Sequence, residues 1–296
     1  MTLDPSRKNP LVSRTAGPDS MARDADIARY YDANTGKFLR FGGSGDVAAI
    51  HRAIWAPGVT SRQQAFQFIN DLAVAAVQPL TARFTETLRI LDLGCGVGGT
   101  ATWLHQKTGA QVLGITISES QVSRARARAG MLGVGDQVTF EKHSFESLAV
   151  PGLFHAACAI ESFVHCRNPE QFLVTVREKL VPGGRLLLCD DFAHPSPPLR
   201  ARGWIRRFKL GWKVNHLLSR DDFVALAAGQ GFRLLESTDL SAFVRHFPWP
   251  MLLLLSQLTR IPLPWAYWQN LAGGTALQVC LKRSYTQYHA LLLERI

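Results

Sequence analysis

The sequence predicts an α/β protein built on a doubly wound, largely parallel sheet. Three observations support this fold class. Strands and helices alternate from about residue 86 onwards, the strands are almost entirely apolar, and a glycine-rich turn follows the first of them. Strands that are covered on both faces appear in a sequence as continuous apolar runs. Phe154–Ile160 is such a run, and the chain of 296 residues suits one domain of this kind with extensions.

The composition narrows the class further. Hydrophobic residues make up 47% and charged residues 19%, and 33 Lys and Arg against 23 Asp and Glu give a net charge of +10. This usage excludes a disordered chain, a coiled coil and a collagen-like fibre. The basic clusters are too modest to predict nucleic-acid binding. They fit a solvated surface, or the attraction of an anionic small substrate.

The cysteines and the termini indicate the compartment. The five cysteines are dispersed and none forms a C-x-x-C pair, so neither a disulfide framework nor a protein metal site is expected. There is no apolar run of about 18 residues to span a bilayer. No apolar region follows Arg7 and Lys8, so we expect no secretory signal and a cytoplasmic location.

The chain divides into three parts. Residues 1–25 are polar, contain proline and glycine, and are predicted to be a disordered tail. Residues 26–85 are rich in aromatic side chains and form a predicted helical cap, in which Ser61 and Gln64 have the spacing of a capping box. Residues 86–296 form the main domain, with predicted insertions at about 192–218 and 239–272.

The elements of the main domain follow in order. Ser118 with Gln121 begins one helix, Asn168 with Pro169 supplies the favoured first residues of the next, and Ser219 with Asp222 begins a third. A turn at 182–184 precedes a strand. The predicted strands are 90–93, 112–115, 138–141, 154–160, 185–189, 232–236 and 276–281. The helices between them are predicted at 100–107, 118–132, from 168 onwards, and at 219–228.

The glycine-rich turn reads Asp92-Leu93-Gly94-Cys95-Gly96-Val97-Gly98-Gly99. Glycines between a strand and a helix let a ligand approach the backbone, and the helix start offers free N–H groups. Gly94, Gly96 and Gly99 satisfy the G-x-G-x-x-G spacing, but the second strand ends Gly-Ile-Thr-Ile-Ser without the acidic residue of a dinucleotide site. The turn is not followed by the lysine of a nucleoside triphosphatase, so that class of enzyme is not expected.

Over residues 88–190 this pattern resembles the class I S-adenosylmethionine-dependent methyltransferases. The turn resembles their first motif, and Pro182-Gly183-Gly184 a later one. The resemblance implies a Rossmann-like seven-stranded sheet whose last strand is antiparallel, with S-adenosylmethionine as cofactor. The segment 114–118 followed by Gln121 resembles the branch with sterol, tocopherol, cyclopropane-fatty-acid and prenyl-diphosphate C-methyltransferases, in which hydroxyls and glutamine replace the ribose-binding acid.

The resemblance also implies roles for single residues. Asp92 would orient the turn and the cofactor's ammonium group. Ser118 and Gln121 would contact the cofactor or form only a capping box, and Phe145 would stack on adenine or belong to the core. The full set of cofactor-binding candidates is Asp92, Gly94, Cys95, Gly96, Gly98, Thr116, Ser118, Gln121, Ser144, Phe145 and Ile160.

The acceptor side is predicted after the fourth strand. Glu161 to His165 resembles an E-x-x-x-H segment of sterol and prenyl C-methyltransferases. A glutamate at the carboxyl end of a buried parallel strand lies in the ligand crevice. As the chamber's sole strong negative charge, it would stabilise the carbocation left when an alkene attacks the methyl group, and then accept a proton. The catalytic candidates are Glu161, His165 and Tyr31. The substrate-binding candidates are Tyr30, Trp55, Phe163, Trp212, Arg40, Arg206 and Lys209. Arg52 is a further cation of the cap that could bind an anionic group.

These observations lead to a first expectation and its alternatives. The expected activity is C-methylation of an isoprenoid alkene, either a prenyl diphosphate or a prenylated natural product, with Mg²⁺ held mainly by a diphosphate substrate. The alternatives are O- or N-methylation of a lipophilic molecule, with Glu161 or His165 as an ordinary base, and a silent binding subunit. Residues 251–255 are expected to form a lid over the pocket, with contact to a bilayer surface as the alternative. The oligomeric state is not predicted.

Overall fold

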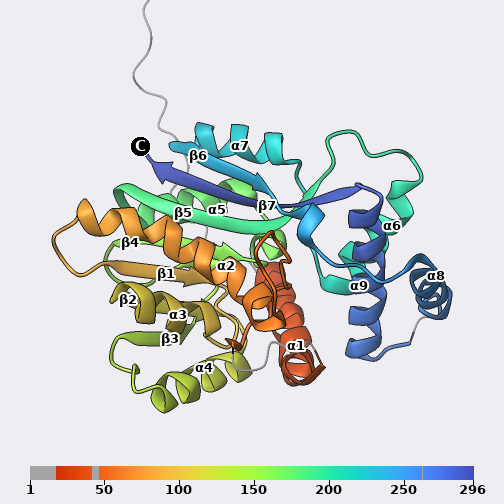
Figure 1. The fold of residues 1–296 in the computed structure, drawn as a ribbon, viewed down its shortest axis with the longest axis horizontal. Helices are drawn as coiled ribbons and strands as arrows, with labels where there is room; N and C mark the ends of the chain where they lie inside the picture. Colours follow the sequence, from red (N-terminus) through yellow and green to blue (C-terminus); the bar gives the residue numbers. More distant parts are fainter. Residues whose placement is uncertain (1–17, 42–46, 262) are drawn as a thin grey trace, which may run out of the picture.

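The computed structural model describes residues 18–41, 47–261 and 263–296. Its centre is a seven-stranded sheet with helices on both faces (Figure 1). The strands are β1 (Arg89–Leu93), β2 (Gln111–Thr116), β3 (Val138–Lys142), β4 (Phe154–Ile160), β5 (Leu180–Ala193), β6 (Phe232–Asp239) and β7 (Thr286–Arg295). Their order is β3-β2-β1-β4-β5-β7-β6. The last strand, β7, is antiparallel to both β5 and β6, which confirms the predicted fold class.

The two faces of the sheet are covered by different helices. One core joins β1 and β2 to α2 (Arg62–Val77), α3 (Gly99–Thr108) and α4 (Glu119–Met131). The other joins β1, β4 and β5 to α5 (Pro169–Lys179) and α7 (Arg220–Gly229). The chain order reverses between β1 and β4, so the carboxyl ends of these strands open the crevice in which such sheets bind ligands.

Four further helices lie beyond those carboxyl ends (Figure 1). They are α1 (Pro18–Phe41), α6 (Ala201–Trp212), α8 (Trp249–Leu258) and α9 (Ala266–Lys282). Gly211 of α6 lies so close to Gly273 of α9 that a Cβ atom on Gly211 would come within 2.5 Å of the Gly273 Cα. Helix α8 packs on α9, and we refer to α6, α8 and α9 together as the outer lobe. Within the described residues, no helix is long and apolar enough to cross a membrane.

The main errors of the sequence prediction fall in this outer part. The apolar run 276–281 was predicted to be the last strand, but it belongs to helix α9, and β7 follows it. A short apolar run does not distinguish a buried helix from a buried strand. The two predicted insertions contain α6, α8 and the start of α9. The predicted tail lies outside the described residues up to residue 17, but α1 begins at Pro18, so residues 18–25 are helical.

Candidate active site

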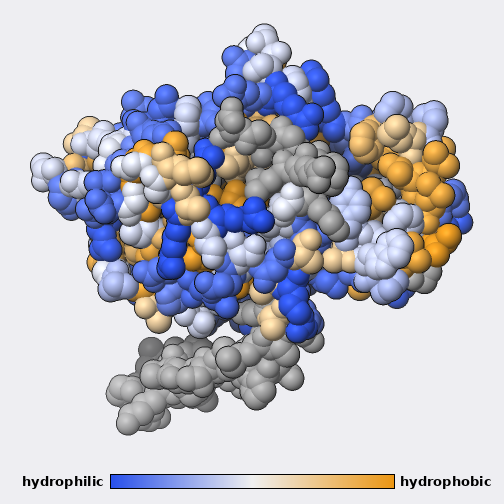
Figure 2. All heavy atoms as spheres, turned by 90° about the horizontal axis from the view of Figure 1, so that it is seen from below, coloured by the Kyte–Doolittle hydropathy of each residue, from blue (hydrophilic) through white to orange (hydrophobic). Residues whose placement is uncertain are grey.

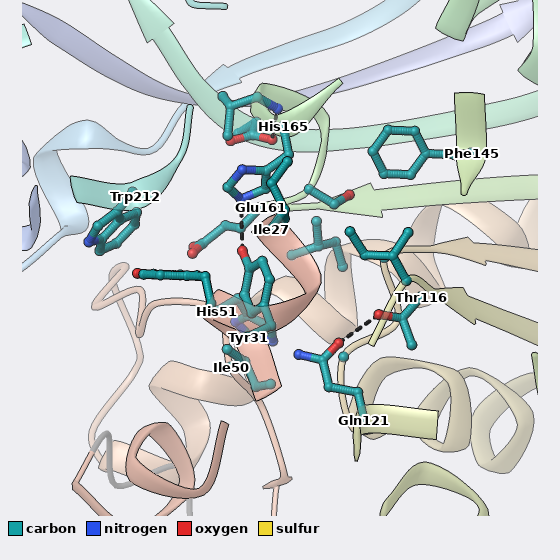
Figure 3. A pocket seen from close by; sticks show the side chains of 18 of the residues that line it. Ile27, Tyr31, Ile50, His51, Thr116, Gln121, Phe145, Glu161, His165 and Trp212 are labelled. Atoms are coloured by element: carbon teal, nitrogen blue, oxygen red, sulfur yellow. Dashed lines mark hydrogen bonds between the residues drawn. The ribbon is translucent and has the colours of Figure 1, made fainter. Parts of the chain in front are cut away.

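The carboxyl ends of β1, β2, β4 and β5 surround a cavity of about 270 Å³ (Figure 3). At one end it is lined by the glycine turn, by Thr116 at the end of β2, and by residues that follow β2 and β3, including Gln121 and Phe145. At the other end it is lined by side chains from α1, α6 and α9, among them Tyr31 and Trp212. The first end carries the predicted cofactor residues, and the second is the acceptor end.

The glycine turn forms a cradle that a side chain would fill. Gly94 has φ +85°, and a Cβ atom there would lie 2.4 Å from the Cβ of Ser162. Helix α3 begins directly after the turn, so its first N–H groups face the cavity end of β1. The side chains of Cys95 and Asp92 lie beneath this cradle.

Asp92 has an unsatisfied oxygen at this position. Its side chain is buried at the carboxyl end of β1, and Oδ1 accepts a weak hydrogen bond from the thiol of Cys158 at 3.5 Å. Among the described residues nothing hydrogen-bonds to Oδ2. Burial raises the pKa of Asp92 to about 7. A buried carboxylate oxygen without a partner, beside a cradle of glycines, fits the cationic ammonium group of S-adenosylmethionine.

Neutral polar groups follow β2, where a dinucleotide-binding protein would have an acid. The hydroxyl of Thr116 donates to Oε1 of Gln121 at 2.7 Å, and both side chains line the cavity. The Ser118 hydroxyl accepts from the backbone N–H of Gln121 at 3.1 Å and donates to the carboxylate of Asp32 on α1. Ser118 therefore caps α4 and holds α1, while Thr116 and Gln121 face the cavity.

His165 and Tyr31 meet at the acceptor end (Figure 3). Nδ1 of His165 lies 3.1 Å from the backbone carbonyl of Lys213. Because a carbonyl only accepts, Nδ1 carries the proton and Nε2 presents a lone pair. The Tyr31 hydroxyl, 2.7 Å away, donates to that Nε2. Burial lowers the pKa of His165, so the imidazole is neutral near pH 7 and can accept a proton.

Glu161 lies in an ionic network. Its Oε1 accepts from the backbone N–H and the Nε of Arg52, both at 2.9 Å, and from the hydroxyl of Tyr288 at 3.1 Å. The remaining guanidinium nitrogens of Arg52 bind both carboxylate oxygens of Asp191, at 2.9 and 2.7 Å. Arg52 also stacks 4.1 Å from the Tyr288 ring centre. Glu161 has φ +49°, a strained backbone conformation that often marks a functional position.

This network corrects one expectation from the sequence. Glu161 is not the only carboxyl group of the chamber, because Glu146, Asp190 and Asp191 line the same cavity. Burial raises the pKa of both aspartates, and Arg52 opposes this rise at Asp191. Glu161 is moreover ion-paired with an arginine distant in sequence, which removes the main argument for Glu161 as an isolated cation stabiliser.

The remaining predicted residues divide into two groups. The first group lines the cavity and consists of Tyr30, Trp212, Ser144, Phe145 and Ile160, together with Gly94 and Gly96 of the turn. Gly98, Trp55, Phe163, Arg206 and Lys209 do not line it. Phe163 is buried in the core between Phe172 and Phe223, and the guanidinium of Arg245 lies 3.3 Å from the ring centre of Trp55. The side chain of Arg40 lies outside the described residues.

The sequence analysis missed several residues of the site. Arg52, in the cap before α2, was expected only as a cation that could bind an anionic group, and its pairing with Glu161 and Asp191 was not foreseen. Asp190 and Asp191 stand near the carboxyl end of apolar β5, so the argument that selected Glu161 applies to them equally. Asn270 of α9 accepts a hydrogen bond from the Tyr30 hydroxyl at 2.6 Å and lines the cavity. It lies in a segment that was expected to be an irregular insertion.

Comparisons with known proteins identify the family. A family profile described as a methyltransferase domain matches residues 90–184. The chain is 34% identical over 229 residues to the O-methyltransferase resE of Aspergillus sclerotiorum, covering 75% of this chain and 81% of that protein. It is 33% identical over 161 residues to the sterol 24-C-methyltransferase ERG6B of Gibberella zeae, covering 52% of this chain and 42% of that protein.

Among solved structures, a geranyl diphosphate methyltransferase in complex with GPP and sinefungin superposes with a TM-score of 0.74 at 19% identity. The superposition covers 93% of this chain and all of the other, and it shows a shared fold. Together with the glycine cradle, the unpartnered oxygen of Asp92 and the sheet order, these similarities confirm the family that the sequence resembles. The chain belongs to the class I S-adenosylmethionine-dependent methyltransferases.

Proposed function

We propose that this enzyme methylates a hydroxyl oxygen of a neutral, largely apolar small molecule, with His165 as the general base. The observation that carries the proposal is the hydrogen-bonding of His165. Lys213 fixes the proton on Nδ1, so that Nε2 directs its lone pair at the Tyr31 hydroxyl in the wall of the cavity. A base held in one tautomer by a backbone carbonyl suits general base catalysis.

The cofactor, when bound, supplies an electrophilic methyl group on a sulfonium. The residues of this chain deal with the proton. As the acceptor oxygen attacks the methyl group, its proton passes to the Tyr31 hydroxyl, and the Tyr31 proton passes to Nε2 of His165. Burial raises the pKa of Tyr31, so a lasting tyrosinate is disfavoured and the two transfers occur together. The negative charge of Glu161 favours the resulting imidazolium, because it raises the pKa of His165 against the effect of burial.

The charges around the cavity favour a neutral acceptor. Among the described lining residues four carry carboxyl groups, and Arg52 is the only lysine or arginine. Its Nε already donates to Glu161, and its Nη1 and Nη2 already donate to Asp191. A diphosphate would meet carboxylates in this wall and no uncommitted cation. Arg206 and Lys209, which were expected to bind such a group, lie elsewhere on α6.

C-methylation of an isoprenoid alkene is the second candidate. It is favoured by Oε2 of Glu161, to which no described residue donates a hydrogen bond, and which can accept a proton from a carbocation. The similarity to a sterol C-methyltransferase is consistent with it. With a prenyl diphosphate as substrate, this candidate would also recruit Mg²⁺ through the phosphates. The described residues contain no cluster of ligands that would hold a metal by themselves.

A labelled methyl group separates the two candidates. The enzyme would be incubated with S-[methyl-13C]adenosylmethionine and, in turn, geraniol, geranyl diphosphate and a panel of apolar phenols and alcohols. Geraniol and geranyl diphosphate share the alkene and differ in the anionic group. We expect an oxygen-bound label on a neutral acceptor and no turnover of the diphosphate. A carbon-bound label, on either prenyl compound, would contradict the proposal.

A further inference from the structure

The two segments that contain the outer lobe carry much of the positive charge of the protein. Residues 192–219 contain six lysines and arginines, and residues 240–283 contain four, and neither segment contains an aspartate or glutamate. These ten cations equal the net charge of +10 of the whole chain. Among the described residues, no acidic side chain forms an ion pair with a lysine or arginine of α6, α8 or α9.

The same lobe exposes an apolar surface. Helix α8 contains no charged residue, and it packs on its neighbours through Leu252 and Ser256. Its remaining surface presents leucines and a methionine to solvent, and Leu254 is 60% exposed. Ile261 and Trp265, between α8 and α9, extend this surface, and Trp265 is 67% exposed. The exposed apolar residues are Met251, Leu253, Leu254, Leu258, Ile261, Trp265 and Tyr267. Figure 2 shows hydrophobic side chains gathered at the right, where α8 lies in Figure 1.

Cations border this apolar surface. Arg207 of α6 donates to the Ser256 carbonyl and, at 2.8 Å, to the Thr259 hydroxyl, which fixes α8 against α6. Burial lowers the pKa of Arg207, and the nearby charge of Arg260 lowers it further, so two like charges are neighbours at the end of α8. Arg206, which directly precedes Arg207 on α6, is exposed. Exposed leucines and a tryptophan beside arginines match the interface of an anionic bilayer, in which apolar side chains enter the acyl boundary and cations meet phosphates.

We propose that the outer lobe docks the enzyme on the surface of an anionic lipid membrane through α8 and the segment that joins it to α9. The charge distribution favours a bilayer over a second copy of this chain, because two copies of the lobe would bring lysines and arginines against lysines and arginines, with no acidic side chain in either segment. Docking there places α6 and α9 next to the lipid. These two helices contribute Trp212 and Asn270 to the acceptor end of the cavity. The inference concerns a surface and holds for either candidate acceptor.

Vesicle sedimentation of the full chain tests this docking. We expect binding to vesicles of phosphatidylcholine and phosphatidylglycerol, weak binding to phosphatidylcholine alone, and a loss of affinity as salt is raised. The Leu253→Ser/Leu254→Ser variant should bind at least about tenfold more weakly, because two leucines no longer leave water. Met131→Ser, at an exposed methionine at the end of α4, is the matched control and should bind like wild type.

The cations are tested in the same way. Arg206→Gln/Arg260→Gln should weaken binding about tenfold or more, whereas Arg124→Gln/Lys107→Gln, at exposed cations outside the lobe, should not. Unchanged S-adenosylhomocysteine binding and thermal unfolding would show that each variant is folded and that its cavity is intact. Absence of sedimentation at low salt would overturn the proposal, as would control variants that weaken binding as much as the lobe variants. A dimer that Leu253→Ser/Leu254→Ser dissociates, without vesicle binding, would also overturn it.

Discussion

The Tyr31 hydroxyl lies 2.7 Å from Nε2 of His165, and it joins the N-terminal helix α1 to the turn that follows β4. Ser118 strengthens the same connection from the other side by donating to Asp32 of α1. Helix α1 therefore closes the cavity over both of its ends, and the acceptor end is complete only when α1 is in place.

The first prediction concerns Tyr31 and pH. Tyr31→Phe removes the hydroxyl that passes the proton to His165, and we expect kcat to fall by roughly 10- to 100-fold with little change in S-adenosylhomocysteine affinity.

The pH dependence of the wild-type rate tests the same base. Since burial lowers the pKa of His165 below 6.5, the base is already neutral at pH 7. The wild-type kcat/KM should thus rise with pH through a pKa below 6.5 and be flat above it. A rate that falls over that range would exclude an imidazole base.

The second prediction concerns the cradle at Gly94. Gly94→Ala should lose measurable binding of S-adenosylhomocysteine in calorimetry, because the new Cβ atom would collide with Ser162 at 2.4 Å and displace the turn. Gly58 is a matched control, since it also has φ +85°, but a Cβ atom added there would meet no other atom within 4 Å. Gly58→Ala should cost only about 1–2 kcal/mol of backbone strain and leave binding intact. Equal binding by the two variants would argue against a cofactor at this turn.

The third prediction concerns the proton of Asp92. Its pKa in the folded protein is about 7, above the ordinary value of 3.8, so the free energy of unfolding should fall as pH rises from 3.8 to about 7. The fall is at most about 4 kcal/mol. Asp92→Asn should reduce the measured slope by this contribution, because Asp190 and Asp191 also have raised pKa values and still contribute. The exposed Asp136→Asn should leave the slope unchanged.

Cofactor binding should release the same proton. The ammonium group of S-adenosylhomocysteine favours the Asp92 carboxylate, so calorimetry near pH 7 in buffers of different ionisation enthalpy should detect proton release. Asp92→Asn should abolish the buffer dependence. Proton uptake on binding would show that Asp92 does not face a cation.

The fourth prediction concerns Arg52. Arg52→Met leaves the carboxylates of Glu161 and Asp191 buried without their partner, and should lower the free energy of unfolding by about 3–5 kcal/mol in urea. Arg52→Lys restores the charge without the two-pronged geometry and should recover part of the loss. The Arg52→Met deficit should shrink at acidic pH, where the carboxyls take up protons. A deficit that grows on acidification would contradict this account of the network.

Much of the sheet could be predicted from the sequence because its signals are local. Phe154–Ile160 is apolar throughout and bounded by turns, and the strand was predicted with its observed bounds. Ser61, Ser118, Asn168 and Ser219 each accept the backbone hydrogen bond of an N-cap, as their residue types indicated. The outer helices α8 and α9 lack such signals: neither has a side-chain cap, and prolines precede both.

The site was harder to predict because its partners are far apart in the chain. Glu161 and His165 could be located from their positions after β4. The partner of Glu161 is Arg52, which is 109 residues away, and no local pattern reveals such a pairing. The carbonyl of Lys213, which sets the tautomer of His165, depends on how α6 ends, with Lys213 at φ +57°.

The most direct test of the central claim compares His165→Gln with Glu161→Gln on the acceptor that the labelling experiment identifies. Glutamine at 161 can still accept from Arg52 and Tyr288, so we expect Glu161→Gln to keep kcat within about tenfold of wild type. His165→Gln should lose roughly 100- to 10,000-fold in kcat. The opposite order, with Glu161→Gln inactive and His165→Gln near wild type, would contradict oxygen methylation by His165 and favour the carbocation route.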